Sequence, residues 1–276
     1  MLKDLFSNLK TRRKIIDADA AIVAFPRCGV PRLRDLLWNY LVIEFNLKAK
    51  RRGDFIELWK QNKSKVPRIA QTNDEDPHTK FPDEIRMDKV AHEGKKVIFL
   101  ARDPRNVIAS LFYRRSRRGY IESNYYWGTL TDFIREGEGS FETLLTYYAS
   151  WVSPDRVKMH HVSYEILHEQ PADELFKIAK FLGIKPSREA CERAVVQTPA
   201  FGEQENSNAS IPRKSAYLEP ELPDDKKEEE EKPKEPYLRE FNDEDLKWLR
   251  IQMDSFLPEE FPFYKKDPVI DQAKDE

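Results

Sequence analysis

Two side chains suited to binding an anion stand eight residues apart near the middle of the sequence, Arg102 and Ser110. An arginine supplies a permanent positive charge with several donors, and a serine supplies a hydroxyl. Residues 97–101 form an uninterrupted apolar run, which predicts a strand buried on both faces. After Asn106 the apolar residues recur at helical spacing, with Asp103 or Asn106 placed to cap the helix. Arg102 would then end a strand, where open α/β sheets bind ligands, and Ser110 would lie two turns into the next helix.

A second candidate anion site follows the first predicted strand, residues 20–25. The sequence FPRCGVPRL leads from this strand into a helix whose apolar spacing begins at Leu33. Gly29 permits a positive φ or a close approach of the backbone, and Pro31 suits the first helical turn. The free amides at the start of a helix, together with its dipole, attract an anion. On its own a glycine in the first turn of an α/β protein is a weak signal.

The length and the charge distribution fit one basic α/β domain with an acidic C-terminal part. The chain has 276 residues, enough to bury a sizeable core. Residues 219–276 hold 10 basic and 20 acidic residues, so residues 1–218 hold 37 basic and 29 acidic ones. The net charge of −2 therefore conceals a body of about +8 and a C-terminal part of about −10. A basic body suits a polyanionic ligand, although solvated surface lysines would give the same count.

The sequence shows no sign of several other classes of protein. Two cysteines, Cys28 and Cys191, give no disulfide framework, and no residues have the spacing of a metal site. The N-terminal segment lacks the apolar core of a signal peptide, and no apolar run approaches the roughly 18 residues that span a bilayer. The basic run at 114–118 is typical of a solvated helix end. We therefore predict a cytoplasmic protein with no metal, no transmembrane segment and no nucleic-acid partner, and leave its oligomeric state open.

The surroundings of these sites resemble one family. Taken alone, Arg102 could simply pair with Asp103, but four segments in order resemble the sulfotransferases that use 3′-phosphoadenosine 5′-phosphosulfate (PAPS): FPRCG, RDPRNVIAS, VSYE and FKIAKFLGI. They extend over most of residues 20–185, and chance does not readily give this order and spacing. The resemblance implies a three-layer, P-loop-like α/β fold with a central parallel sheet flanked by helices. It also implies PAPS as co-substrate and 3′-phosphoadenosine 5′-phosphate (PAP) as product.

The resemblance also assigns residues to the nucleotide. It implies that Arg102 and Ser110 hold the 3′-phosphate and that Tyr164, in VSYE, contacts the nucleotide. Arg213 and Lys214 match a loop that closes over the 3′-phosphate. The loop after the first strand resembles the family's 5′-phosphosulfate loop, whose usual form is close to PKSGTTWL, and the residues implied to bind there are Arg27, Cys28, Gly29, Val30 and Arg32.

This loop departs from the family pattern in several places. Arg27 stands where a lysine usually stabilises charge on the bridging oxygen, and an arginine has the charge but a different reach. Cys28 replaces a serine, Arg32 a tryptophan, and Val30 and Pro31 the paired threonines. Neither Val30 nor Pro31 supplies a hydroxyl, and Pro31 has no amide hydrogen.

Two residues are candidates for the base that takes the acceptor's proton, one at the family's position and one nearby. The family has a histidine at the position of Asn73, and an asparagine is no base at neutral pH. His78 lies a little further on, in DPHTKFP. Its ordinary pKa suits a base, but a surface histidine with a loop hydrogen bond fits the sequence equally well. His160 and His161 lie in a predicted strand, where adjacent side chains face opposite ways, and we expect structural roles for them.

The resulting hypothesis is a sulfotransferase that moves a sulfuryl group from PAPS to a hydroxyl or amine of a small molecule, sugar or lipid. The alternative is a non-catalytic nucleotide-binding protein of the same fold, and a P-loop kinase is disfavoured because GxxxxGK[ST] is absent. We expect a helical extension at 1–19, the main domain at 20–264 and a flexible tail at 265–276. Within the domain, 219–236 is predicted to be an acidic, disordered insertion. Asn242 is expected to cap the last helix.

Overall fold

The fold is built on four parallel strands. The computed structural model describes residues 15–116, 126–198, 240–261 and 264. In the order β2-β1-β3-β4 the strands are Ile69–Thr72, Ala20–Ala24, Lys96–Ala101 and Lys158–Ser163. Every pairing between neighbours is parallel, and their first residues lie side by side. All four carboxyl ends therefore meet at one edge of the sheet, as the sequence predicts for an α/β fold.

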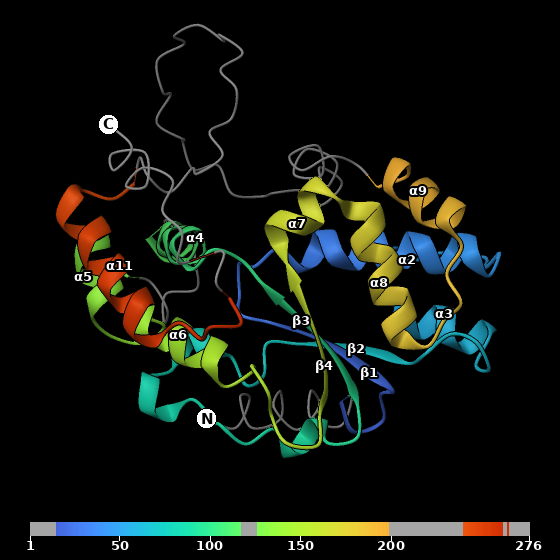
Figure 1. Ribbon diagram of the computed structural model, residues 1–276, viewed down its shortest axis with the longest axis horizontal. Coiled ribbons are helices and arrows are strands. Elements are labelled where there is room, and N and C mark those ends of the chain that lie inside the picture. Colours follow the sequence, from blue (N-terminus) through green and yellow to red (C-terminus); the bar gives the residue numbers. More distant parts are fainter. Residues whose placement is uncertain (1–14, 117–125, 199–239, 262–263, 265–276) are drawn as a thin grey trace, which may run out of the picture.

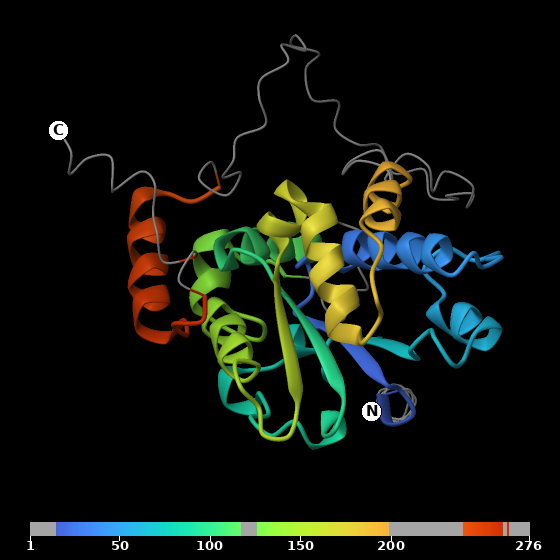
Figure 2. The ribbon, with the colours of Figure 1, turned by 45° about the vertical axis from the view of Figure 1, so that its right-hand side comes forward.

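Helices cover both faces of this sheet and make the three-layer architecture (Figures 1 and 2). One layer contains α2 (Val30–Glu44), α3 (Phe55–Gln61), α8 (Pro171–Leu182) and α9 (Arg188–Val196). The other contains α4 (Pro104–Ser116), α5 (Leu130–Arg135), α6 (Phe141–Ala149) and α11 (Asp243–Phe256). The short helix α7 (Tyr164–Glu169) follows β4 directly, and three 3-10 turns lie between β2 and β3: η1 (Pro77–Thr79), η2 (Pro82–Glu84) and η3 (Val90–His92).

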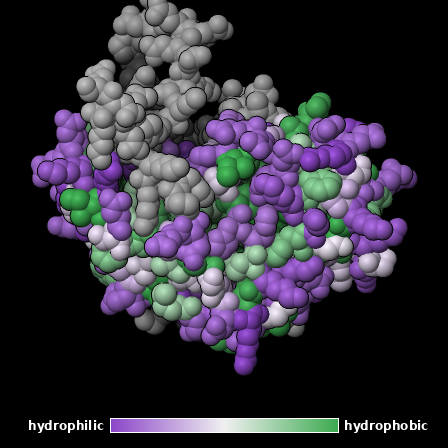
Figure 3. All heavy atoms as spheres, viewed as in Figure 1, coloured by the Kyte–Doolittle hydropathy of each residue, from purple (hydrophilic) through white to green (hydrophobic). Residues whose placement is uncertain are grey.

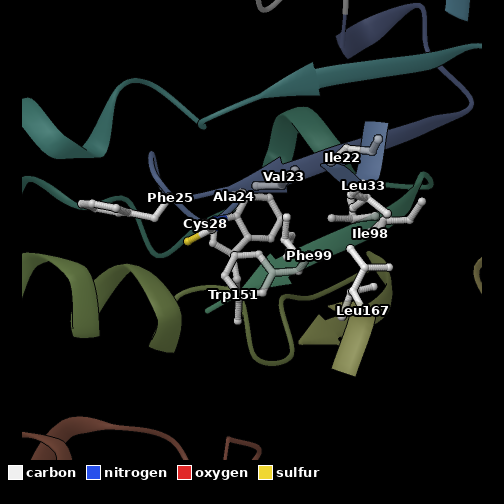
Figure 4. Packing of buried hydrophobic residues seen from close by; sticks show 14 of the residues in the cluster. Ile22, Val23, Ala24, Phe25, Cys28, Leu33, Ile98, Phe99, Trp151 and Leu167 are labelled. Atoms are coloured by element: carbon white, nitrogen blue, oxygen red, sulfur yellow. The ribbon is translucent and has the colours of Figure 1, made fainter. Parts of the chain in front are cut away.

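The core lies on both sides of the two central strands. Every residue of β1 is buried, which is why this segment is apolar without alternation. In β3, Ile98 lies near Leu33 and Leu167, whereas Phe99 lies on the opposite side with Trp151 (Figure 4). The rings of Phe99 and Trp151 stack with centroids 6.0 Å apart. On the face shown in Figure 3, hydrophilic residues dominate and hydrophobic ones form small separate groups.

The predicted strands and their following helices are present, with small differences at their ends. Gly29, at φ 90°, precedes α2, so Pro31 occupies the second helical position and not the first. Gly183 ends α8 at φ 89°, and the Asn242 side chain caps α11 by accepting from the amide of Asp245. The sequence analysis missed α5 and α9. Tyr164 begins a helix, and Ser163 caps it by accepting from the amide of Ile166.

Several expectations fall outside the described residues. These are most of the extension at 1–19, the insertion at 219–236 and the tail at 265–276. None of the helices in the described ranges has the length and apolarity needed to cross a membrane. Both cysteines are free thiols, Cys28 and Cys191, and both are buried.

Candidate functional site

Three strand ends lie together at the upper edge of the sheet in Figure 1, and each is followed at once by a helix. The loop at residues 25–29 joins β1 to α2, residues 102–103 join β3 to α4, and Ser163 joins β4 to α7. The starts of three helices thus converge on the segments in which the sequence analysis placed an anion site. The electrostatics of helix starts favours a negatively charged ligand there.

Gly29 has two independent reasons to be a glycine. Its φ of 90° is a conformation that side chains disfavour, and a Cβ added there would lie 2.5 Å from two ring atoms of Tyr164. The loop therefore packs directly under the tyrosine that the resemblance assigned to the nucleotide. Arg27 also has a positive φ, 78°, and its side chain is exposed. This backbone brings the loop's arginine to the surface and turns Cys28 into the core.

The arginine of the loop contacts both residues of the other predicted motif. Arg27 donates from Nε to Oγ of Ser110 over 2.8 Å. Arg102 donates from Nη1 to the carbonyl oxygen of Arg27 over 3.2 Å. Arg102 and Ser110 therefore both contact Arg27, which follows a different strand of the sheet. Nε of Arg102 is buried and has no hydrogen-bond acceptor in the described part of the chain.

Tyr148 of α6 connects the turn after β1 to the turn after β3, a role that the sequence analysis missed. Its hydroxyl donates to the carbonyl of Arg102 over 2.7 Å, accepts from the amide of Arg102 over 3.0 Å, and lies 3.3 Å from Sγ of Cys28. Burial raises the pKa of the Cys28 thiol to about 12, so it stays protonated at neutral pH. Because its side chain is fully buried, Cys28 can offer a ligand only its backbone.

Tyr164 and Glu165 connect the third strand end to the second. The guanidinium of Arg102 lies 4.7 Å from the centroid of the Tyr164 ring. Burial raises the pKa of Tyr164, with the nearby Arg102 charge opposing, so the phenol is neutral. The Glu165 carboxylate accepts from the amide of Asp103 over 2.9 Å and from the hydroxyl of Ser163 over 2.8 Å. The turn after β3 is thereby fixed to the start of α7.

Two further residues of the divergent loop, Val30 and Arg32, pack against other parts of the protein. Val30 is half-buried and packs against the core. Arg32 donates from Nη1 to the carbonyl of Thr198, at the end of α9, over 3.2 Å. Asn39 donates to the Thr198 hydroxyl over 2.7 Å, which fixes the same point of α9 to α2. Burial lowers the pKa of Arg32 from its ordinary value. The structure thus gives Arg32 a contact with a helix that the sequence analysis had not predicted.

The connection between β2 and β3 separates the two residues considered for proton transfer. The carbonyl of Asn73 accepts from the hydroxyl of Tyr147 over 3.2 Å. The next three residues, 74–76, all have positive φ, between 53° and 71°, and none is a glycine. Asp74 pairs with the buried Lys89 over 2.8 Å. This strained turn carries the chain away from Asn73 before it reaches His78.

His78 lies beside the C-terminal end of α4. Its carbonyl accepts from Nη1 of Arg115 over 3.5 Å, and a Cβ on Gly139 would lie 2.3 Å from that carbonyl oxygen. Arg115 is five residues beyond Ser110 on α4, or about 7 Å along the helix axis. Burial lowers the pKa of His78, with Asp76 opposing, so the imidazole is neutral at pH 7, as a base must be.

Other residues noted in the sequence have contacts of their own. His160 bonds to Glu174 over 3.1 Å and His161 stacks on Phe261, so both have packing partners, as expected of structural residues. Tyr126 packs on Phe133 with centroids 4.9 Å apart. Arg213 and Lys214 lie outside the described residues. Within the described ranges, no three His, Cys, Asp or Glu side chains are grouped as metal ligands.

The comparison with family models decides the family. The model described as "Sulfotransferase domain" matches residues 17–230. The chain belongs to the sulfotransferase domain family.

A solved sulfotransferase structure shares the fold. The chain resembles mouse sulfotransferase SULT7A1, whose structure contains PAP, with 16% identity, a TM-score of 0.53, and coverage of 87% of this chain and 83% of that one. It also resembles retinol dehydratase, in a complex with androsterone and inactive cofactor PAP, with 16% identity, a TM-score of 0.49, and coverage of 90% and 84%. A search of curated proteins gave no significant match.

Proposed function

We propose that this sulfotransferase-family protein binds PAPS at the ends of β1, β3 and β4 and transfers its sulfuryl group to a hydroxyl or amine. The observation that carries the proposal is the convergence of Arg27, Ser110 and Arg102, two cations and a hydroxyl, beside the glycine turn at the start of α2. A nucleotide with phosphates on both its 3′ and 5′ carbons presents two anionic groups. The two adjacent turns offer donors to both.

Each residue has a defined task in this proposal. Arg102 and Ser110 bind the 3′-phosphate, and the buried Nε of Arg102 supplies a donor that lacks an acceptor in the described residues. The Gly29 turn and the amides beginning α2 bind the 5′-phosphate. Tyr164 lies against both the turn and Arg102 and contacts the nucleotide.

We propose that Arg27 stabilises the leaving phosphate. In the transfer, an acceptor oxygen or nitrogen forms a bond to sulfur while the bond from sulfur to the bridging phosphate oxygen breaks, and PAP leaves. Negative charge grows on that oxygen, and Arg27, bonded to Ser110 and beside Arg102, can neutralise it. Positioning and charge stabilisation carry most of such a reaction, as in phosphoryl transfer.

The acceptor's proton needs a base, and we propose neutral His78 for it. The competing hypothesis is a nucleotide-binding protein without transfer activity, favoured by Asn73 at the family's histidine position. The acceptor is proposed to be a small-molecule, sugar or lipid hydroxyl or an amine. A reducing, cytoplasmic location is proposed from the two free cysteines, Cys28 and Cys191.

Calorimetry with PAP, ATP and a short RNA tests the binding proposal, and transfer of labelled sulfate from PAPS to a panel of hydroxyl and amine acceptors tests the reaction. We expect PAP to bind with at least tenfold higher affinity than ATP, because ATP has no 3′-phosphate for Arg102. Equal binding of PAP and ATP would contradict the site. Binding of PAP without transfer to any acceptor would favour the non-catalytic protein.

A further inference from the structure

The chain returns to the sheet after α11, beyond the end of the family match. Phe261 is 1% exposed and its ring stacks on His161, with centroids 5.4 Å apart, and lies 5.5 Å from the Tyr148 ring. Tyr264 is 3% exposed, and its ring stacks on Phe261 at 6.2 Å. These aromatic residues come after residue 230, where the family model ends. Phe261 and Tyr264 are therefore part of the packed domain.

The phenol of Tyr264 completes the hydrogen bonding of one carboxylate. It donates to Oε2 of Glu165 over 3.0 Å, and the same carboxylate accepts from Ser163 and from the amide of Asp103. Glu165 is thus held from three parts of the sequence. Burial raises the pKa of Tyr264 well above its ordinary value, and the Glu165 charge adds to this, so the phenol keeps its proton.

The Glu165–Asp103 hydrogen bond joins two residues that each follow a proposed nucleotide contact in the sequence. Asp103, the amide partner, follows Arg102 directly, and Glu165 itself follows Tyr164. The Arg102 guanidinium and the Tyr164 ring face each other at 4.7 Å. A shift of the Glu165 carboxylate would therefore move both partners of that contact. Tyr148 fixes the other side of Arg102, through the amide and carbonyl of the same peptide segment.

We propose that Tyr264 is a positioning residue for the nucleotide site and acts through Glu165 on Arg102 and Tyr164. This inference rests on the proposed function, because it assumes that Arg102 binds the 3′-phosphate. The hydroxyl of Tyr264 touches neither phosphate. Its effect is to hold the turn after β3 in the orientation that aims the guanidinium at the 3′-phosphate, so it favours nucleotides that carry this group.

The test compares PAP with AMP, which lacks the 3′-phosphate, for wild type and Tyr264→Phe. The substitution removes one hydroxyl and keeps the buried ring. We expect PAP affinity to fall about 3- to 10-fold, less than a direct contact to a charged group contributes because Tyr264 acts only through Glu165, and AMP affinity to fall by a smaller factor because AMP lacks the 3′-phosphate. Calorimetry gives the affinity for PAP, and competition gives the weaker affinity for AMP.

A matched control is Tyr113→Phe. Tyr113 also donates from its phenol to a carboxylate of the C-terminal part, that of Glu240, but it is exposed and does not contact Glu165. We expect this variant to bind both nucleotides like wild type. A double variant, Glu165→Gln with Tyr264→Phe, should bind PAP about as weakly as Glu165→Gln alone, because the two residues act in series.

Two results would overturn the inference. Tyr264→Phe could bind PAP as wild type does, or it could lose PAP and AMP affinity by the same factor, which would show a general structural effect. Wild type that fails to bind PAP would instead refute the proposed function, and the inference with it. Thermal unfolding of each variant, followed by circular dichroism, verifies that the proteins compared are folded.

Discussion

Arg27 donates its Nε hydrogen to the hydroxyl of Ser110, although 83 residues separate them in the sequence. The parallel sheet makes this contact possible, because β1 and β3 are neighbours and their carboxyl ends coincide. Each residue had been assigned to a different phosphate of the nucleotide. In the proposed site the two phosphate subsites therefore share one hydrogen-bonded wall, and we expect a change in one subsite to alter binding in the other.

Arg102→Ala should weaken PAP binding by roughly 10- to 100-fold. A charge-assisted contact to phosphate contributes roughly 1.5–3 kcal/mol. Calorimetry with PAP measures the loss. Arg193→Ala, which removes an exposed arginine of α9, should bind PAP normally. An unchanged affinity in folded Arg102→Ala would remove this residue from the site.

Arg27→Ala should lower the rate of sulfuryl transfer by about 10²- to 10³-fold, as expected for the loss of a group that stabilises transition-state charge. PAP affinity should fall much less, because the 3′-phosphate contacts of Arg102 remain. Single-turnover rates and PAP affinity separate the two effects. Arg27→Lys, which restores the family's usual residue, should recover part of the rate. Equal losses of rate and affinity in Arg27→Ala would argue against a specific role in the transition state.

His78→Ala should keep PAP affinity and lose roughly 10²- to 10⁴-fold in transfer rate if the neutral imidazole is the base. The pH profile of wild type gives a second measurement. Because burial lowers the pKa of His78, the rate should fall with acid only below the ordinary histidine range, and His78→Ala should lack this limb. Asn73→His, which restores the family's histidine, tests the alternative hypothesis that the protein has lost its activity. If this variant gains activity that wild type lacks, the non-catalytic hypothesis is correct and His78 is not a base.

The free energy of unfolding should fall as the pH is lowered through about 6.5, partly because of His92. This histidine is 1% exposed, neither ring nitrogen has a hydrogen-bond partner in the described residues, and burial lowers its pKa. The unfolded chain therefore takes up the proton at a higher pH than the folded one, and acid favours unfolding. His92→Phe, which keeps a ring against Trp151, should flatten this dependence between pH 7 and 5. Urea titrations across that range measure it.

The control for this experiment is His168→Gln, at an exposed histidine of α7. It should leave the slope of stability against pH as in wild type. A slope that is equally steep in His92→Phe would assign the acid sensitivity to other groups. Burial also lowers the pKa of His78 and His161, and these two would be the next to replace.

The sequence was informative where a signal is local. Apolar runs and helical spacing predicted the central strands, and the strand–turn–helix pattern placed Arg102 and Ser110 at the same edge as Gly29. The role of Tyr148 could not be predicted, since in sequence it is one more aromatic residue of an amphipathic helix. Its hydroxyl partners lie 46 and 120 residues away. No local pattern predicts the hydrogen bond between Tyr264 and Glu165 either, because only tertiary packing brings the two residues together.

The order of synthesis gives the Tyr264–Glu165 contact a further consequence. The two residues are 99 positions apart, so at about 5–20 residues per second the ribosome adds Tyr264 roughly 5–20 s after Glu165. During that interval the residues of the three strand ends have already been synthesised, while the Glu165 carboxylate lacks the hydrogen bond from Tyr264. From the positioning role proposed for Tyr264, we expect a nucleotide that meets the chain during translation to find an incomplete site until Tyr264 has docked on Glu165.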